Sequence, residues 1–147
     1  MENSGKQILV LLVEDDPGDQ KLIKTAIMSQ GYRVNLMIAS SGESAINYLQ
    51  MCKEDSEKYQ KPCLILLDLN MPGMGGKEFL REIKADDELC AIPVVVVTTS
   101  DSEADTRECY ELQAAGYIQK AAVPEEFNDI FKKLTRYWFS LSAMVKS

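Results

Sequence analysis

Residues 63–76, CLILLDLNMPGMGG, join an unbroken apolar run to one carboxylate and then to a loop rich in proline and glycine. An apolar run of this length is typical of a β-strand that is covered on both faces, as in a parallel sheet. The proline and glycines that follow predict a turn rather than a longer strand. We therefore predict a buried strand over residues 63–67, with Asp68 at its carboxyl end.

The same alternation of elements extends over most of the chain. Four further apolar runs predict strands at residues 8–13, 34–39, 93–97 and 117–119. Apolar residues at helical spacing predict helices over residues 19–30, 45–52, 77–84, 103–115 and about 125–144, while residues 53–61 either extend the second helix or form a loop. This order predicts a doubly wound α/β fold, with a five-stranded parallel sheet and helices on both faces.

The composition argues against several classes of protein. The chain has 147 residues, enough for one ordinary domain, and its net charge is −7 because 23 acidic residues outnumber 16 basic ones. This excess of acid makes the chain a poor general binder of nucleic acid and of anionic membranes. No apolar run reaches the about 18 residues of a membrane span, and the polar start does not fit a signal peptide. We expect a cytoplasmic protein that binds neither nucleic acid nor membrane.

The chain contains no histidine and only four widely spaced cysteines. The absence of histidine excludes an imidazole general base, a Ser-His-Asp triad and a histidine metal site. The cysteines form no CxxC pair, so we expect four reduced thiols. Any chemistry must therefore use carboxylates, hydroxyls, lysine and a hard cation.

Polar side chains follow four of the predicted strands, namely Glu14 and Asp15, Asp68, Thr98 and Lys120. The carboxyl ends of neighbouring parallel strands meet at one edge of a sheet, so these side chains are expected to share one pocket. Three carboxylates in one place repel one another unless a cation binds between them, and oxygen ligands with open water positions suit Mg²⁺. Such a cation beside a carboxylate, a hydroxyl and an ammonium group suits phosphoryl transfer to the carboxylate.

Taken singly, each of these residues also fits a structural role, such as an exposed acidic turn, a polar strand end or a packed hydroxyl. Asp16, which precedes Pro17, fits a turn or the cap of a helix. Tyr117, on the fifth predicted strand, fits a packed aromatic residue. The joint arrangement at the strand ends favours the pocket over these separate explanations.

Four stretches of the chain together resemble the receiver domain of two-component response regulators. They are LLVEDD (residues 11–16), LLDLNMPGMGG (66–76), PVVVVTTS (93–100) and GYIQK (116–120), and the resemblance covers residues 7–134. It implies a flavodoxin-like sheet with the strand order 2-1-3-4-5. It also implies a single receiver domain over residues 1–147, in which the last helix (about 125–144) is extended.

The resemblance implies a role in phosphoryl transfer for four residues. Asp68 would accept a phosphoryl group from the phosphohistidine of a sensor histidine kinase, and Lys120 would pair with a phosphoryl oxygen. Thr98 would be the switch hydroxyl that turns toward this oxygen, and Tyr117 would move with it. The chain departs from the family at Ala121, where a proline usually follows the lysine.

The resemblance also implies a set of Mg²⁺ ligands. Asp15 and Asp68 would bind the cation directly, and Asn70 would provide its backbone carbonyl. Glu14 would hold a water molecule that is bound to the metal.

The predicted last helix carries an apolar stripe that is rich in aromatic residues. Its members are Phe127, Ile130, Phe131, Leu134, Trp138 and Leu141, with Tyr137 and Phe139 beside them. A helix that stays apolar beyond the sheet favours burial against a partner, so we predict a homodimer through this helix and the fifth strand. Packing within one chain is the alternative. This extension, together with VEDDPGD (13–19) and TTS (98–100), is similar to regulators paired with bacterial phytochromes.

Three functions are compatible with this pattern. The first is a signalling module that is switched by phosphorylation of Asp68. The second is a docking or adaptor protein of the same fold that works without phosphorylation, but such a protein would be expected to lack part of the pocket. The third is a metal-dependent phosphohydrolase, which would need a second acid near the nucleophile, whereas position 70 is Asn.

Overall fold

The computed structural model of the protein describes residues 8–120 and 124–141. Within this range the strands are β1 (Ile8–Val13), β2 (Val34–Ala39), β3 (Leu64–Leu67), β4 (Val94–Thr98) and β5 (Gly116–Gln119). The helices are α1 (Pro17–Met28), α2 (Gly42–Glu54), α3 (Gly76–Ala85), α4 (Glu103–Glu111) and α5 (Pro124–Arg136), and a π-helical segment, η1 (Tyr137–Leu141), follows α5. Every predicted strand and helix is present, with ends that differ by a few residues.

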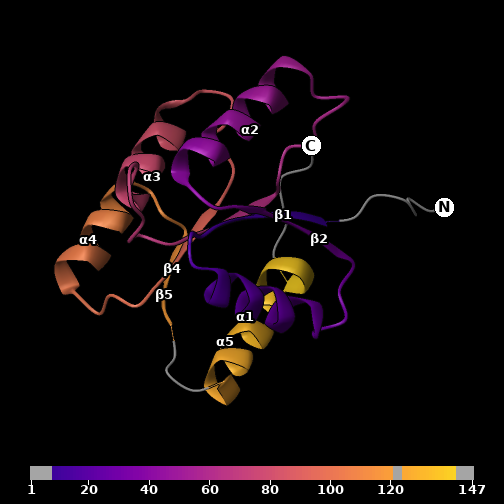
Figure 1. Cartoon of the computed structure of the whole chain (residues 1–147), viewed down its shortest axis with the longest axis vertical. Coiled ribbons are helices and arrows are strands. Elements are labelled where there is room, and N and C mark those ends of the chain that lie inside the picture. Colours follow the sequence, from indigo (N-terminus) through magenta and orange to yellow (C-terminus); the bar gives the residue numbers. More distant parts are fainter. Residues whose placement is uncertain (1–7, 121–123, 142–147) are drawn as a thin grey trace.

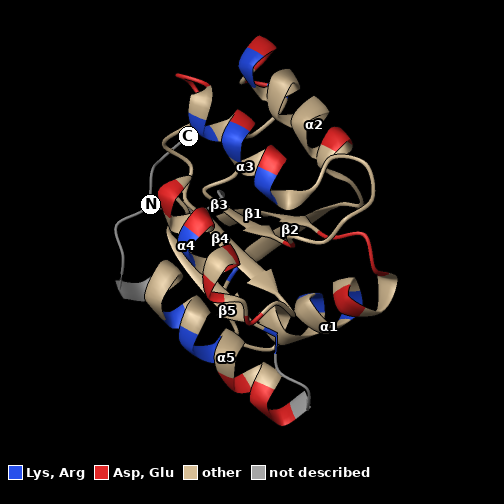
Figure 2. Ribbon diagram, turned by 90° about the vertical axis from the view of Figure 1, so that its left-hand side faces the viewer, with Lys and Arg blue, Asp and Glu red and all other residues tan. Residues whose placement is uncertain are grey.

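The described residues form three layers with a parallel sheet in the middle (Figure 1). The strand order of the five-stranded sheet is β2-β1-β3-β4-β5, so the predicted doubly wound, flavodoxin-like fold is confirmed. Helices α1 and α5 cover one face of the sheet, and α2, α3 and α4 cover the other. Charged positions lie mainly on the helices and loops, and the centre of the sheet is free of them (Figure 2).

Each face of the sheet buries its own apolar layer. Neighbouring residues of one strand, such as Leu11 and Leu12, belong to opposite layers because side chains alternate along a strand. Phe79 of α3 fills the layer on one side, and Phe131 of α5 fills the layer on the other. Since both faces are covered, the strands are apolar at nearly every position, which is the pattern that predicted them.

Two helices end differently from the prediction. Helix α4 was predicted to continue to residue 115 but ends at Glu111, because Gln113 adopts a φ of 72° in the left-handed region and Ala114 N–H closes onto the Cys109 carbonyl. In the last helix, the hydroxyl of Thr135 donates to the carbonyl of Phe131 at 2.8 Å, just before the π-helical segment begins. Side-chain bonds of this kind bend helices. Residues 142–144 of the predicted helix lie outside the described residues.

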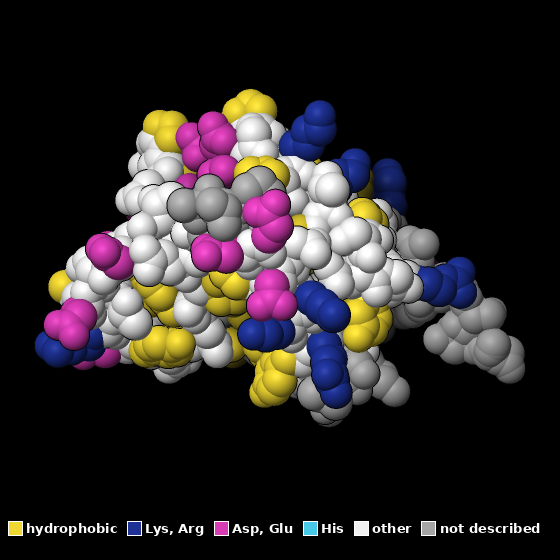
Figure 3. Space-filling model, turned by 90° about the horizontal axis from the view of Figure 1, so that it is seen from below, with side chains coloured by type: hydrophobic (Ala, Val, Ile, Leu, Met, Phe, Trp, Pro, Cys, Tyr) yellow, Lys and Arg dark blue, Asp and Glu magenta, His cyan; other side chains and the backbone are white. Residues whose placement is uncertain are grey.

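The surface seen from below Figure 1, on the side of α1 and α5, is divided by charge (Figure 3). Most acidic side chains in this view lie at the left and in the upper middle and most basic ones at the right, although some basic groups adjoin acidic ones, and hydrophobic side chains are scattered between them. Within the described ranges, no helix has both the length and the apolar character needed to cross a membrane.

Gly76 determines how the loop after β3 returns to α3. Its N–H donates to the carbonyl of Leu69 at 3.0 Å, so the first turn of α3 lies directly against the backbone that follows Asp68. A Cβ atom at Gly76 would overlap the carbonyl oxygen of Asp68 and would lie 2.6 Å from the Cα of Leu69. At Gly75 the nearest atom to a new Cβ is the Leu69 carbonyl oxygen, at an ordinary 3.7 Å. Glycine is therefore required at position 76 but not at position 75.

We expect Gly76→Ala to lower the free energy of unfolding by about 3 kcal/mol, because the new methyl group has only rigid backbone to displace. Gly75→Ala is the matched control, and its cost should be about 1 kcal/mol or less since it changes only a helix cap. Urea unfolding followed by circular dichroism measures both. Equal effects of the two substitutions would contradict the role of this close approach.

Candidate functional site

Three carboxylates meet at the carboxyl edge of the sheet. Glu14, Asp15 and Asp68 each offer an oxygen atom, and these oxygens lie within 4.8 Å of one another. Val13 and Leu67 are partners in the register of β1 and β3, and the N–H of Asp68 extends this ladder to the Val13 carbonyl at 3.0 Å. The predicted meeting of these acids follows directly from the order of the strands.

The carboxylates are held at an electrostatic cost. Glu14 is 1% exposed and Asp68 is 6% exposed. Burial, and after it the repulsion from Asp68, raises the pKa of Glu14, although hydrogen bonding to Lys120 opposes this. Burial also raises the pKa of Asp68, with a further contribution from Asp15, while Lys120 and the backbone N–H of Asn70 act in the opposite direction. The pocket has more negative charge than its own residues neutralise.

This donor set fits a hard divalent cation. The three acids present oxygen atoms only, at a spacing that one ion can bridge, and oxygen ligands without imidazole or thiolate suit hard cations. A cation between the acids would also remove the repulsion that disfavours their ionised forms. Asn70 is an exposed residue of the loop after β3, and its backbone N–H interacts with the carboxylate of Asp68.

Lys120 is the cation that the chain itself provides. Its side chain is 6% exposed, and its Nζ atom lies 2.8 Å from Glu14 Oε1, 2.7 Å from Asp19 Oδ2 and 3.8 Å from Asp68 Oδ1. Burial alone would lower the pKa of Lys120, but the hydrogen bonds to Asp19 and Glu14 and the charge of Asp68 outweigh it and raise this pKa. The backbone N–H of Lys120 donates to the Thr98 carbonyl at 2.7 Å. The peptide bond to Ala121 lies outside the described residues.

Asp19 is a residue of the site that the sequence pattern did not reveal. The predicted helix began at Asp19, but α1 begins two residues earlier, with Pro17 in its first turn and the carboxylate of Asp16 accepting from the Asp19 N–H at 2.8 Å. Asp16 is thus the helix cap, as one interpretation of the sequence had it. The cap and Pro17 were the available signals, since they place Asp19 in the first turn of α1.

Thr98 and Tyr117 make their hydrogen bonds at a different point, the loop after β4. Thr98 is fully buried, and its hydroxyl accepts a long bond of 3.4 Å from the N–H of Ser100. The hydroxyl of Tyr117 donates to the carbonyl of Ser100 at 3.0 Å. Its half-buried ring packs against the apolar layer that α2, α3 and α4 cover. The two predicted switch residues are therefore connected through Ser100, a link that the sequence did not predict.

A parallel sheet of this order, with clustered acids, a buried lysine and a buried threonine at one edge, defines a receiver domain. A family model described as the response regulator receiver domain matches residues 10–132. The chain belongs to this family, which serves in two-component signalling.

Comparison with individual proteins shows a more specific likeness within this family. Response regulator Rcp1 of Synechocystis sp. is 37% identical over 131 residues, which are 89% of this chain and 86% of that protein. The crystal structure of the phosphorylated cyanobacterial phytochrome response regulator RcpA has a TM-score of 0.87 and 34% identity, covering 95% of this chain and 99% of that one. The Mn²⁺-bound form of Rcp1 has a TM-score of 0.84 and 34% identity, covering 93% and 98%. This chain is similar to phytochrome-linked regulators.

We expect Asp19→Asn to lower the free energy of unfolding by about 1 kcal/mol, because buried Lys120 would keep only a neutral acceptor where it now has a charged one. Asp129→Asn is the matched control: Asp129 pairs with Lys133 on the exposed surface of α5, and the loss of such a pair costs less than about 0.5 kcal/mol. Urea unfolding measures both. A control effect as large as that of Asp19→Asn would show that the bond to Lys120 contributes nothing specific.

Proposed function

We propose that the chain is a response regulator that accepts a phosphoryl group on Asp68 from a sensor histidine kinase. The observation that carries this proposal is the cluster of three acids, two of them buried, that meets Lys120 at the ends of β1 and β3. In the reaction, an Asp68 oxygen forms a bond to phosphorus while the bond from phosphorus to the kinase histidine nitrogen breaks. The products are an acyl phosphate on Asp68 and a neutral imidazole on the kinase.

The proposed cation is Mg²⁺, and Asp15, Asp68 and the Asn70 carbonyl would bind it directly, with Glu14 holding a metal-bound water. When bound, it would neutralise charge on the phosphoryl oxygens. Three carboxylates meet here with one buried lysine, so the cluster has too little positive charge of its own, and this supports the assignment.

Lys120 would pair with a phosphoryl oxygen. Its Nζ atom is 3.8 Å from Asp68 but is bonded to Glu14 and Asp19, so it would have to exchange one of these partners for the new anion. Thr98 would turn its hydroxyl to another phosphoryl oxygen, and Tyr117 would follow this movement through the loop that both residues contact. The output of the protein would be this change of conformation.

The expected result with acetyl phosphate and Mg²⁺ is one acid-stable, base-labile phosphoryl group per chain, detected by intact-protein mass spectrometry. Asp68→Asn should abolish it because the nucleophile is lost, and chelation of the cation should do the same. Asp87→Asn, which changes an exposed acid in the loop after α3, is the control and should react like the wild type.

A phosphoryl group that persists in Asp68→Asn would place the acceptor elsewhere. Rapid turnover of donor without a stable phosphoprotein would favour the hydrolase that the sequence left open.

We propose a phytochrome-type sensor kinase as the partner. The support is the likeness to RcpA and Rcp1, which extends over nearly the whole chain. The proposed location is the cytoplasm, and neither nucleic acid nor membrane is a proposed partner.

The proposed assembly is a homodimer through β5 and the last helix. Part of the aromatic stripe is used within the chain, because Phe127, Phe131 and Leu134 are buried in the apolar layer of α1 and α5. Beside them, α4, β5 and the last helix line a hollow of about 570 Å³, and Tyr110 and Tyr137 at its rim are 49% and 53% exposed. Strand β5 is also at the edge of the sheet. A second copy would cover this apolar edge.

Size-exclusion chromatography with light scattering should show a dimer at about 100 µM or above. Tyr137→Glu should shift the protein toward monomer, because it places a charge in the apolar hollow. Leu22→Glu, at an exposed apolar position on α1, is the matched control and should leave the mass unchanged. A wild-type monomer at this concentration would contradict the dimer.

A further inference from the structure

Ser100 lies at the centre of a hydrogen-bond network in the loop after β4. Its carbonyl accepts from Tyr117, and its N–H faces the Thr98 hydroxyl. Its own hydroxyl donates to Asp105 Oδ2 at 2.6 Å and accepts from the N–H of Ser102 at 3.2 Å. The position of the carbonyl that Tyr117 uses therefore depends on Asp105, in the first turn of α4.

Asp105 is in turn held by a lysine of the neighbouring helix. Lys77, in the first turn of α3, places its Nζ atom 2.6 Å from Asp105 Oδ1 and 2.8 Å from Glu108 Oε1. These bonds raise the pKa of Lys77, and the bonds from Lys77 and then Ser100 lower the pKa of Asp105. The side chains of Lys77 and Asp105 are about one-third exposed. Because Asp105 also accepts from the Ser100 hydroxyl, the bond from Lys77 connects α3 to α4 and to the loop that contains Ser100.

We propose that Lys77 and Asp105 form a clamp that holds Ser100 as the acceptor for Tyr117. The clamp thereby favours the inward position of the tyrosine ring, in which the ring is half-buried and its hydroxyl donates to the Ser100 carbonyl. This inference rests on the proposed phosphorylation of Asp68 and names two positioning residues for it. Neither side chain belongs to the cluster of acids or contacts Lys120 in the bonds described above.

The clamp is expected to raise the rate at which Asp68 is phosphorylated. Tyr117 and Val96 are partners in the register of β5 and β4, and Thr98 follows two residues later on the same face of β4. A ring held at the Ser100 carbonyl would occupy the space on this face of β4 beside Thr98. The Thr98 hydroxyl, which accepts only a long bond of 3.4 Å from the Ser100 N–H, would then be free to turn toward Asp68. The clamp therefore favours the arrangement that binds a phosphoryl group, and its loss should slow phosphorylation.

The first measurement is the exposure of Tyr117 in the unphosphorylated protein. With 3-fluorotyrosine incorporated at the six tyrosines, Tyr117→Phe identifies the ¹⁹F resonance of residue 117. Its shift between H₂O and D₂O reports contact with solvent. Lys77→Met should increase this contact, and Lys77→Arg, which keeps the charge, should restore the wild-type value.

The second measurement is the initial rate of phosphorylation by acetyl phosphate with Mg²⁺. Lys77→Met and Asp105→Ala should each slow it by about three- to tenfold, the effect of one charged, partly exposed bond. In a Tyr117→Phe background, Lys77→Met should cause no further loss because the clamp acts through the tyrosine hydroxyl. Lys53→Met is the matched control: Lys53 pairs with Asp86 at 2.7 Å.

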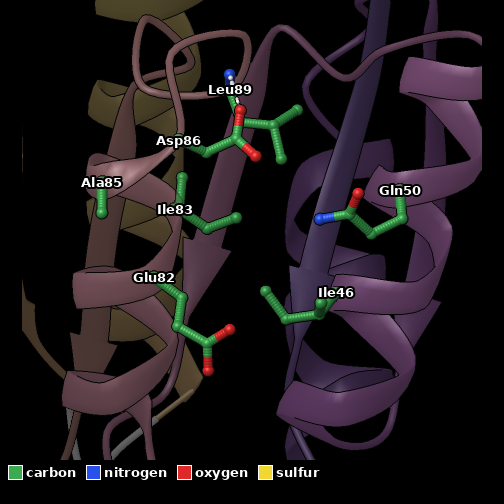
Figure 4. A pocket seen from close by; sticks show the side chains of 7 residues that line it. All are labelled: Ile46, Gln50, Glu82, Ile83, Ala85, Asp86 and Leu89. Carbon is green, nitrogen blue, oxygen red and sulfur yellow. Dashed lines mark hydrogen bonds between the residues drawn. The ribbon is translucent and has the colours of Figure 1, made fainter.

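The control pair is similar in exposure and geometry but has no connection with Ser100. It joins α2 to the end of α3, where Asp86 also accepts from the N–H of Leu89 and borders a hollow between the two helices (Figure 4). Its loss should leave both measurements at the wild-type values.

Three results would overturn the clamp. The first is an unchanged Tyr117 resonance in Lys77→Met. The second is a faster reaction of Asp105→Ala, which would mean that Lys77 attracts the anionic donor. The third is an equal loss of rate with and without the tyrosine hydroxyl. A wild-type protein that takes no phosphoryl group would instead refute the proposed function, while the exposure of Tyr117 would still be measurable.

Discussion

The site depends on one constraint, which is the burial of like charges at the carboxyl ends of neighbouring strands. The sheet places Glu14 after β1 and Asp68 after β3, and the ladder between Val13 and Asp68 gives the two acids little freedom to separate. Their repulsion is relieved in part by Lys120, which directly follows the edge strand β5. The folded site is therefore stabilised by positive charge close to the two acids, which either a metal ion or a lysine can supply.

The sequence alone predicted those residues of the site whose positions follow from the order of the strands. Glu14, Asp68 and Lys120 follow apolar runs, and any parallel sheet with these strands as near neighbours brings their ends together. Asp19 could not be placed in the same way, because its direction depends on a helix that starts two residues earlier than its apolar spacing suggests. Topology fixes strand ends, whereas the direction of a side chain on the first turn of a helix depends on the cap.

The connections around Ser100 were beyond the sequence for a different reason. Lys77 and Asp105 are charged residues on two separate helices, and their pattern alone is that of solvated surfaces. Their pairing depends on how α3 and α4 pack side by side, which no local pattern specifies. Likewise, the half-buried position of Tyr117 is consistent with a packed aromatic residue. Its bond to the Ser100 carbonyl shows that Tyr117 and Thr98 both contact the same residue of the loop after β4.

The charges of the pocket also determine how its acids and its lysine affect stability. Because the pKa values of Glu14 and Asp68 are raised, folding favours their protonated forms, and this contribution is lost as the pH rises through the raised values. The raised pKa of Lys120 acts at the other end, since its contribution is present below the ordinary lysine value and is lost above the raised one. The pocket thus combines a lysine whose charged form folding favours with two acids whose ionised forms burial disfavours, and this mismatch strains the site. Ligands that bring positive charge or replace a carboxylate partner of Lys120 would act on this strain, so the proposed phosphorylation of Asp68 would be felt by Glu14, Lys120 and Asp19 together.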